Sequence, residues 1–189
     1  MSTGDRIPLP EARQLATDFA RLFDGCWERW VIAGSVRRQM PDVGDIEHVV
    51  VPKMGEVKGT GLFAEPGNML WQRCDDLLAS GEIVKALYGD KQQTRWGEKY
   101  RGIAWRGTKH EIFTADAANW GSVLAIRTGP GEFSKAMVMK LNADGLYRQA
   151  DGYLRYASGA SVGQIKPCAT EEAYFEAVGW KYKAPEERR

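Results

Sequence analysis

Two acidic residues, Asp45 and Glu47, are separated by one residue in the segment DIEHVVVP, whose run of β-branched side chains predicts a strand. Side chains two positions apart on a strand share a face, so both carboxylates point the same way, about 6–7 Å apart. Anions this close repel one another unless a cation lies between them, and Mg²⁺ with oxygen ligands suits that place. The pair therefore predicts a divalent-metal site, against the simpler alternative of an exposed edge strand with two solvated acids.

The residues just before this strand predict a turn suited to phosphate groups. Gly34 allows a ligand to approach the backbone closely, and Ser35 supplies a hydroxyl. The N–H groups at the start of a short helix would face a phosphate, and Arg37 and Arg38 add guanidinium groups with geometry suited to its oxygens. A phosphate-binding turn that leads into a two-carboxylate strand seldom arises by chance, so the turn favours the metal site over solvated acids.

A two-metal site needs a third anion, and Glu111 in the segment KHEIF offers one on another predicted strand. Taken alone, Glu111 would be read as a solvated residue at a sheet edge. His48 and His110 each fall on the face opposite their neighbouring acid by strand parity. We therefore expect packing or surface histidines there, and neither a His/Cys metal set nor a nucleophile–histidine dyad is predicted.

Helical and strand-like periodicities along the chain indicate the elements that must position these residues. Predicted helices cover residues 10–24, 68–80, 119–129, 131–145 and 170–179. Predicted strands cover residues 29–34, 45–52, 99–107 and 109–115, with a hairpin at 146–156. Turns are expected at Gly107–Thr108 and Asp151–Gly152, and the Gly- and Lys-rich stretch 53–67 is predicted as a loop. A change of character near residue 128 predicts an α+β fold, with a mixed sheet-plus-helix lobe followed by a smaller lobe.

The overall composition is that of an ordinary globular protein. The chain has 189 residues, of which 43% are hydrophobic and 27% charged, and its formal net charge is +1. This balance excludes a uniformly basic coat for nucleic acid, but not a local basic face. Cys26, Cys74 and Cys168 are odd in number and far apart, which excludes a disulfide framework and a CxxC-type zinc site. Neither a signal-like segment nor an apolar run of roughly 18 residues occurs, so a reduced, cytosolic setting is expected.

Several motifs resemble those of family X DNA polymerases. The nucleotidyltransferase signature, Gly-Ser followed after a gap by acid-x-acid, matches GSVRRQMPDVGDIE, and its GSxRR…VGDIE form is similar to that of family X. The family's Thr-Gly…Phe junction between palm and thumb resembles IRTGPGEFSKAM. Its thumb hairpin resembles GLYRQADGYLR, and its closing segment resembles VGWKYKAPEERR. The resemblance covers roughly residues 8–189, with the motifs in the family's order.

The resemblance implies a nucleotidyltransferase palm over residues 1–127, built on a mixed β-sheet with helices on one face, and a small α/β thumb over residues 128–189. It extends to no lyase or helix-hairpin-helix domain, and is closest in form to the reduced palm-plus-thumb members known from viruses. In such a palm, Asp45, Glu47 and Glu111 would be the catalytic carboxylates that hold two Mg²⁺ ions, for which Mn²⁺ can substitute.

By the same resemblance, a nucleotide would lie against residues of both subdomains. The expected contacts are Gly34, Ser35 and Arg38 at the β- and γ-phosphates, Ile126, Arg127, Thr128 and Gly129 along the sugar, and Ser134 near the base. Glu replaces the family's Asp at positions 47 and 111, so each carboxylate reaches about 1.3–1.5 Å further, which predicts slow, Mn²⁺-favoured or absent activity. Ile126 and Arg127 stand where family members often place an aromatic pair, so a strict preference for deoxynucleotides is not expected.

The function implied is that of a DNA-directed DNA polymerase that adds nucleotides to a primer 3′-OH in short-gap filling or repair. Its partners would be DNA, as primer–template or gapped duplex, and a dNTP or rNTP. A cytoplasmic monomer with no membrane association is expected, in the host cytoplasm if the protein is viral. The basic residues expected to contact DNA are Lys135, Lys140, Lys181, Lys183, Arg188 and Arg189. Two alternatives stay open: a template-independent or small-substrate nucleotidyltransferase, and a catalytically weakened DNA-end-binding protein.

Overall fold

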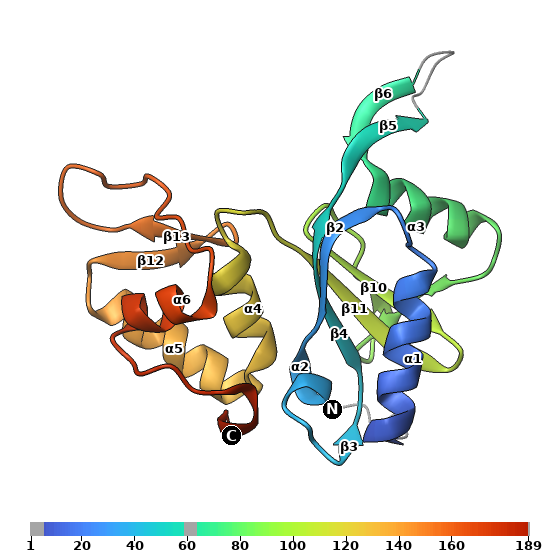
Figure 1. Cartoon of the computed structure of the whole chain (residues 1–189), viewed down its shortest axis with the longest axis horizontal. Helices are drawn as coiled ribbons and strands as arrows, with labels where there is room; N and C mark the ends of the chain where they lie inside the picture. Colours follow the sequence, from blue (N-terminus) through green and yellow to red (C-terminus); the bar gives the residue numbers. More distant parts are fainter. Residues whose placement is uncertain (1–5, 59–63, 189) are drawn as a thin grey trace.

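A five-stranded mixed sheet forms the centre of the larger lobe (Figure 1). The computed structural model describes residues 6–58 and 64–188. Across the sheet the order is β2 (Trp27–Ile32), β4 (Ile46–Pro52), β11 (Thr108–Thr114), β10 (Tyr100–Trp105) and β7 (Val84–Lys85). Strands β4 and β11 run parallel, whereas the other neighbouring pairs are antiparallel. The predicted α+β class is confirmed by this mixed sheet together with its helices.

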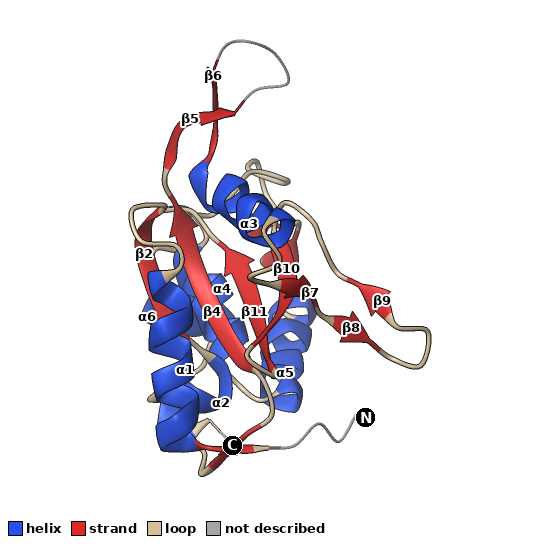
Figure 2. Cartoon of the chain, turned by 90° about the vertical axis from the view of Figure 1, so that its right-hand side faces the viewer, coloured by secondary structure: helices blue, strands red, loops and turns tan. Residues whose placement is uncertain are grey.

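Two helices cover one face of the sheet. Figure 2 shows α1 (Leu9–Arg21) and α3 (Met69–Ala79) in front of β4 and β11. The core beneath them contains Phe19, Phe23, Val50, Leu70, Cys74, Leu77, Ile103 and Ile112. Apolar residues at helical spacing place one side of each helix on this core, as predicted, although α1 ends at Arg21 instead of continuing to residue 24.

The opposite face of β4 packs against α4 (Trp120–Thr128), which begins the smaller lobe. Val49 lies in a buried cluster with Trp120 and Leu124, whereas its neighbour Val50 lies in the core beneath α1 and α3. The alternation of side chains along the strand therefore sends odd-numbered residues of β4 towards α4. Glu47 is one of these residues.

The smaller lobe consists of α4, α5 (Gly131–Ala143), the hairpin β12 (Tyr147–Ala150) and β13 (Tyr153–Tyr156), α6 (Glu171–Val178) and the short 3₁₀ helix η1 (Pro185–Glu187). Its own core contains Ala125, Met137, Leu141, Leu154, Cys168, Tyr174, Phe175 and Val178. Among residues 6–58 and 64–188, no helix is long and apolar enough to cross a membrane.

Local signals in the sequence account for the ends of two elements in the smaller lobe. The β12–β13 turn falls at Asp151 and Gly152, which both have positive φ (54° and 81°), as a two-residue hairpin turn requires. Helix α6 begins after Thr170, whose hydroxyl accepts a hydrogen bond from the Ala173 N–H at 3.2 Å. It ends at Gly179 in the left-handed region (φ 74°). Both elements were predicted in these places.

The prediction of a loop over residues 53–67 is wrong. Strands β5 (Met54–Lys58) and β6 (Ala64–Asn68) pair there as an antiparallel hairpin that extends beyond the sheet in Figure 1, and residues 59–63 lie outside the described part. Two of the glycines that suggested a loop, Gly55 and Gly67, allow close packing instead. A Cβ on Gly55 would lie 2.7 Å from the Met69 sulfur, and one on Gly67 would lie 2.4 Å from a methyl of Val57.

Short elements complete the larger lobe. They are β1 (Ile7–Pro8), α2 (Gly34–Arg37), β3 (Asp42–Val43), β8 (Leu87–Tyr88) and β9 (Gln93–Thr94). The pairing of β8 with β9 was not predicted. The β10–β11 turn falls at Arg106 and Gly107 (φ 48° and 74°), one residue earlier than expected, because the register pairs Trp105 with Thr108.

Candidate active site

The three predicted carboxylates meet on one face of β4 and β11. Glu111 of β11 is the direct partner of Glu47 of β4 in the parallel register. Asp45 immediately precedes β4, two residues before Glu47, so it falls on the same side of the sheet. Residues from two separate parts of the chain are thereby brought into one acidic group.

Glu47 bears most of the electrostatic cost of this arrangement. Burial raises the pKa of its carboxyl to about 8, and the nearby charges of Asp45 and Glu111 add to the effect. Arg127 and Arg38 act in the opposite direction without cancelling it. Glu47 is therefore largely protonated at neutral pH unless a further cation joins the group.

Gly34 makes room for the Glu47 side chain at the turn into α2. A Cβ at position 34 would lie 2.1 Å from Glu47 Oε2, and the residue has a φ of 58° in the left-handed region. Glycine is required here for both reasons. The predicted close approach at Gly34 thus exists, but it is made by a side chain of the protein.

Glu111 is held by two tyrosines that the sequence analysis did not single out. The Tyr88 hydroxyl, on β8, donates to Glu111 Oε1 at 2.9 Å, and the Tyr100 hydroxyl lies 2.9 Å from the same oxygen. The two hydroxyls are 2.7 Å apart. Burial raises the pKa of both phenols, that of Tyr100 to about 12, and the neighbouring Glu111 adds to the effect, whereas the hydrogen bond to Tyr88 lowers the pKa of Tyr100. Both tyrosines therefore stay neutral hydroxyls at ordinary pH.

Lys109 also contacts the acidic group. Its Nζ lies 3.2 Å from Asp45 Oδ2 and 3.8 Å from Glu111 Oε1. Lys109 precedes Glu111 by two residues on β11, so strand parity places it on the acidic face. That parity was the one signal in the sequence that could have identified it.

A cavity of about 400 Å³ opens beside Asp45 and Glu47, towards the smaller lobe. Its lining residues are Ser35, Arg38, Asp45, Glu47, Ile126, Arg127, Gly129, Pro130, Gly131 and Ser134. Most of the residues expected around a nucleotide therefore surround one space. Two carboxylates and two guanidinium groups within it provide oxygen ligands for a cation and donors for phosphate.

Gly34 and Thr128, which were also expected at the nucleotide, do not line this cavity. Thr128 is buried, where its hydroxyl accepts from Arg37 and its carbonyl accepts from Arg38, each at 2.6 Å. Ser134 lines the cavity, but its hydroxyl donates to the Ile126 carbonyl at 2.6 Å. Thr128 and Ser134 therefore help to shape the wall of the cavity.

Comparison with known proteins found two similarities. The family model described as DNA polymerase beta thumb matches residues 127–189. DNA polymerase lambda of Rattus norvegicus is 25% identical over 199 residues, covering 97% of this chain and 33% of that protein. Both similarities are to DNA polymerases, which agrees with the resemblance of the sequence motifs. It spans about a third of the length of the rat relative.

The smaller lobe is joined to α2 by a buried ion network. Arg37 donates to both oxygens of Glu171, at 2.9 and 2.6 Å, and Arg188 donates to Glu171 Oε1 at 2.6 Å. Burial by itself would raise the pKa of Glu171, but the hydrogen bonds from Arg37 and Arg188 lower it. Glu171 is therefore a buried carboxylate that stays charged and connects three segments far apart in the chain.

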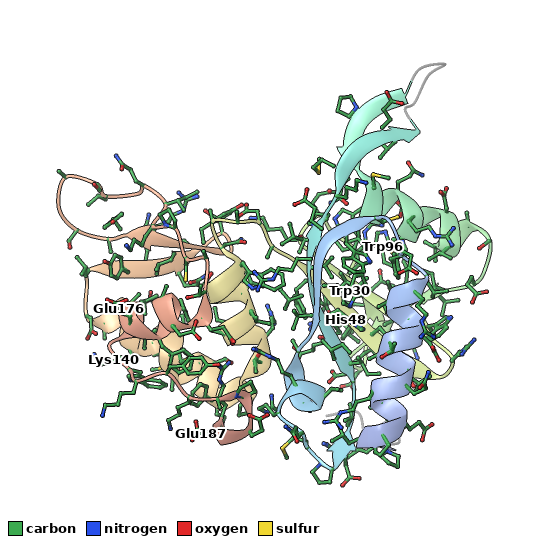
Figure 3. The ribbon with its side chains drawn as sticks, viewed as in Figure 1. Trp30, His48, Trp96, Lys140, Glu176 and Glu187 are labelled. Atoms are coloured by element: carbon green, nitrogen blue, oxygen red, sulfur yellow. The ribbon has the colours of Figure 1, made fainter. Side chains whose placement is uncertain are left out.

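This network corrects one part of the predicted DNA-binding strip, the set of basic residues expected to contact DNA. Arg188 is 1% exposed and donates to Glu171 and to the Lys183 carbonyl, so its guanidinium does not face solvent. Lys140 projects from α5 (Figure 3) and pairs with Asp144. Lys135, Lys181 and Lys183 are exposed, and Arg189 lies outside the described residues. The strip is narrower than predicted because the closing segment folds back against α6.

The two histidines are packing residues on the other face of the sheet, as predicted. His48 and His110 are fully buried, and His48 Nε2 lies 3.1 Å from His110 Nδ1. Trp30 Nε1 donates to His48 Nδ1 at 3.0 Å, which requires the proton of neutral His48 to be on Nε2 (Figure 3). Both rings stack on Phe19 of α1, so they lie on the face of the sheet that α1 covers, opposite the acidic face.

The carboxylates suit the divalent metals that the motif resemblance implies, because Mg²⁺ and Mn²⁺ prefer oxygen ligands. Glu47, crowded by Asp45 and Glu111, is a position where added positive charge would be favourable. Within residues 6–58 and 64–188, however, no three His, Cys, Asp or Glu side chains are arranged to hold an ion. Lys109 and the two tyrosines engage oxygens that a metal would need. Residue types fit the metal, whereas these side-chain positions must change to accept it.

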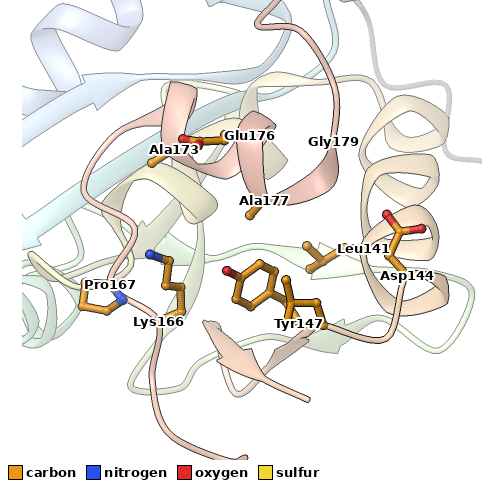
Figure 4. Close-up of a pocket in the computed structure, with 10 residues that line it drawn as sticks. Leu141, Asp144, Tyr147, Lys166, Pro167, Ala173, Glu176, Ala177 and Gly179 are labelled. Carbon is orange, nitrogen blue, oxygen red and sulfur yellow. The ribbon is translucent and has the colours of Figure 1, made fainter. Parts of the chain in front are cut away.

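A second cavity, of about 320 Å³, lies within the smaller lobe (Figure 4). Tyr147, Lys166 and Glu176 are among its lining residues, and it shares no lining residue with the acidic cavity. Leu141 and Ala177 also line it. We assign the chemistry to the acidic cavity, because that is where carboxylates and arginines converge.

Proposed function

We propose that the chain is a nucleotidyltransferase of the family X DNA polymerase type, which adds nucleotides to a primer 3′-OH by a two-metal reaction. The observation that carries this proposal is the convergence of Asp45, Glu47 and Glu111 beside a cavity that also contains Arg38 and Arg127. The similarity of residues 127–189 to a DNA polymerase beta thumb supports DNA, as primer–template or gapped duplex, as the partner.

The reaction requires the primer 3′-oxygen to attack the α-phosphorus of a nucleoside triphosphate, while the bond to pyrophosphate breaks. Two bound Mg²⁺ ions, held by Asp45, Glu47 and Glu111, would lower the pKa of the attacking hydroxyl and neutralise charge on the phosphates. Glu111 does not line the cavity itself; in the proposed reaction it would position the hydroxyl and accept its proton. Arg38 and Arg127 then face the triphosphate, where negative charge accumulates as pyrophosphate leaves.

The walls of the cavity bear on the choice of sugar. Ile126 and Arg127 line the side where the sugar would lie, and the Arg127 guanidinium stacks 3.8 Å from the centre of the Phe113 ring. That stacking holds Arg127 close to Glu47, where it acts on the carboxyl's charge. An aliphatic side chain and a cation offer a 2′-hydroxyl less steric opposition than two aromatic rings would, so use of rNTPs as well as dNTPs belongs to the proposal.

A second candidate, a DNA-end-binding protein with weak or no catalysis, is favoured by the same site. Lys109 already lies between two of the acids, and Glu at positions 47 and 111 places both carboxylates further from the strands than Asp would. A template-independent or small-substrate transferase also fits the acidic group. It leaves the thumb-like residues 127–189 without a role.

Primer extension tests the proposal directly. The chain would be incubated with a gapped duplex, an open primer–template or a single-stranded primer, with each dNTP and rNTP, in Mg²⁺ or Mn²⁺. We expect extension on the gapped or open template that is abolished by Asp45→Asn and retained by Asp24→Asn, an exposed acid outside the site. Salt-sensitive DNA binding without incorporation would favour the end-binding candidate, and extension confined to the single strand would favour the template-independent one.

A further inference from the structure

Four ionisable residues form a square on the acidic face. Register pairs Glu47 with Glu111, and it pairs Ile46 with His110, so Asp45 and Lys109 are level with one another one step earlier. The 3.2 Å separation of Lys109 Nζ from Asp45 Oδ2 agrees with that placement. Three corners of the square are therefore acids and the fourth is a lysine.

Two hydroxyl groups and an ammonium group surround a single oxygen of Glu111. Tyr88 and Tyr100 each place a hydroxyl 2.9 Å from Oε1, and Lys109 places its ammonium 3.8 Å from the same atom. A carboxylate oxygen has two lone-pair sites, so these contacts leave Oε1 little capacity for another partner. The Glu111 side chain is only 12% exposed, whereas Lys109 is 34% exposed and has room to move into solvent.

We propose that Lys109 is an internal counter-cation that caps Asp45 and Glu111 in the metal-free protein and that a divalent ion must displace. The proposal rests on the proposed function, in which these acids are metal ligands. A monovalent ammonium stabilises the acids less than a divalent ion at the same place, because Coulomb energy scales with charge. Lys109 is then a positioning residue that keeps the carboxylates gathered before the metal arrives and reduces the affinity of the site for it.

The proposal accounts for two features together. The acids lie close enough to repel one another, yet in the described part of the chain they form no ready metal site. A lysine between two of them explains both, since it stabilises the crowded carboxylates while engaging Asp45 Oδ2 and lying near Glu111 Oε1. Tyr88 and Tyr100 hold Glu111 in the position that the ammonium can reach.

Mn²⁺ binding measured without DNA or nucleotide tests the cap. Free Mn²⁺ would be followed by electron paramagnetic resonance at about pH 8, where competition from protons is reduced. We expect Lys109→Met to bind Mn²⁺ about tenfold more tightly than wild type, and Lys109→Arg, which keeps the charge, to stay within about twofold. Lys53→Met is the matched control, because Lys53 is an exposed lysine that directly follows β4, and it should bind Mn²⁺ as wild type does.

A second measurement uses the unaltered protein and does not depend on a variant folding. An ammonium paired with two carboxylates is protected from acylation, so adding Mg²⁺ should increase modification of Lys109 by an amine-reactive ester, quantified by mass spectrometry. Lys53 should be modified equally with and without the ion. Protection of Lys109 that Mg²⁺ leaves unchanged would overturn the cap.

The outcomes separate this proposal from the proposed function. If the wild type extends primers but Lys109→Met binds Mn²⁺ no more tightly, the cap is wrong and the polymerase proposal stands. If neither protein binds Mn²⁺ and neither extends a primer, both proposals fail. Tighter Mn²⁺ binding by Lys109→Met, with increased acylation of wild-type Lys109 in Mg²⁺, supports the cap whatever the turnover rate.

Discussion

Glu47 of β4 and Glu111 of β11 are register partners on adjacent parallel strands, with their side chains on the same face. Directly opposed side chains on neighbouring strands lie about 5 Å apart at Cβ, and like charges so placed destabilise a sheet. Here burial of Glu47, together with the charges of Asp45 and Glu111, raises the pKa of its carboxyl to about 8. A protein that keeps such a pair accepts lower stability for a site able to gather positive charge.

Glu47→Gln should therefore stabilise the metal-free protein. A carboxyl whose pKa is raised on folding contributes full stability below its unfolded pKa of about 4.5, and loses that contribution as pH rises through about 8. In chelator at pH 7.5, we expect the variant to gain about 2 kcal/mol, or roughly 5 °C in Tm, while losing nucleotide incorporation. Thermal unfolding at pH 5 and 7.5 measures the difference, which should shrink at the lower pH. Glu28→Gln, which changes an exposed residue of β2, serves as control, and an equal gain in stability there would contradict the explanation.

The buried histidine pair predicts sensitivity to acid. Burial lowers the pKa of His48 well below 6.5 and that of His110 to about 3, so the folded state resists protonation that the unfolded chain accepts. Stability is then fully present above about pH 6.5 and is lost as pH falls towards 3, by up to about 1.4 kcal/mol per pH unit for each ring. Urea unfolding between pH 7.5 and 4.5 gives this slope. His110→Phe, which can still stack on Phe19, should reduce it by about half; an unchanged slope would count against the pair.

Gly34→Ala should disrupt the site more than a glycine substitution elsewhere. A Cβ there meets Glu47 Oε2 at 2.1 Å and must also adopt a φ of 58°. We expect a loss of about 2–3 kcal/mol and displacement of the Glu47 carboxylate. Gly25→Ala is the matched control, because its φ of 81° carries the backbone strain but no atom lies within 4 Å of the added Cβ. It should lose only about 1 kcal/mol in denaturant unfolding, and equal losses for the two variants would refute the role of the contact.

Glu171→Gln tests the ion network that joins α2 to the smaller lobe. Removing the charge leaves Arg37 and Arg188 without their shared buried carboxylate, which should cost about 3 kcal/mol in denaturant unfolding. Limited proteolysis should also cleave the variant faster in the segment between α6 and the end of the chain. The neighbouring Glu172 is exposed, so Glu172→Gln should change stability by less than about 0.5 kcal/mol. Similar losses in both would mean that the network contributes little.

Features set by neighbouring residues could be predicted from the sequence. Asp45 and Glu47 share a face because side chains alternate along any strand. Asp151 and Gly152 form the hairpin turn because this pair adopts the positive φ that the turn requires more readily than most other pairs. The helices followed from apolar spacing and caps. The loop prediction for residues 53–67 was wrong because glycines suggested a loop, whereas Gly55 and Gly67 allow close contacts with Met69 and Val57.

The closing segment shows where composition misleads. Arg188 was expected to face DNA because the end of the chain is basic, but the short helix η1 returns it to Glu171, where it is buried. Exposure of a charged residue depends on which distant carboxylate the fold brings near, and local sequence carries no record of that.

The sequence by itself determined which residues could do the chemistry, since residue type and strand parity are local properties. Only the tertiary structure decided their partners. The parallel pairing of β4 with β11 aligned Glu111 with Glu47 and brought Lys109 to Asp45, and the β8–β9 hairpin carried Tyr88 onto Glu111. Register between strands more than 60 residues apart is set by burial of their apolar faces against α1, α3 and α4, and that packing involves the whole chain at once.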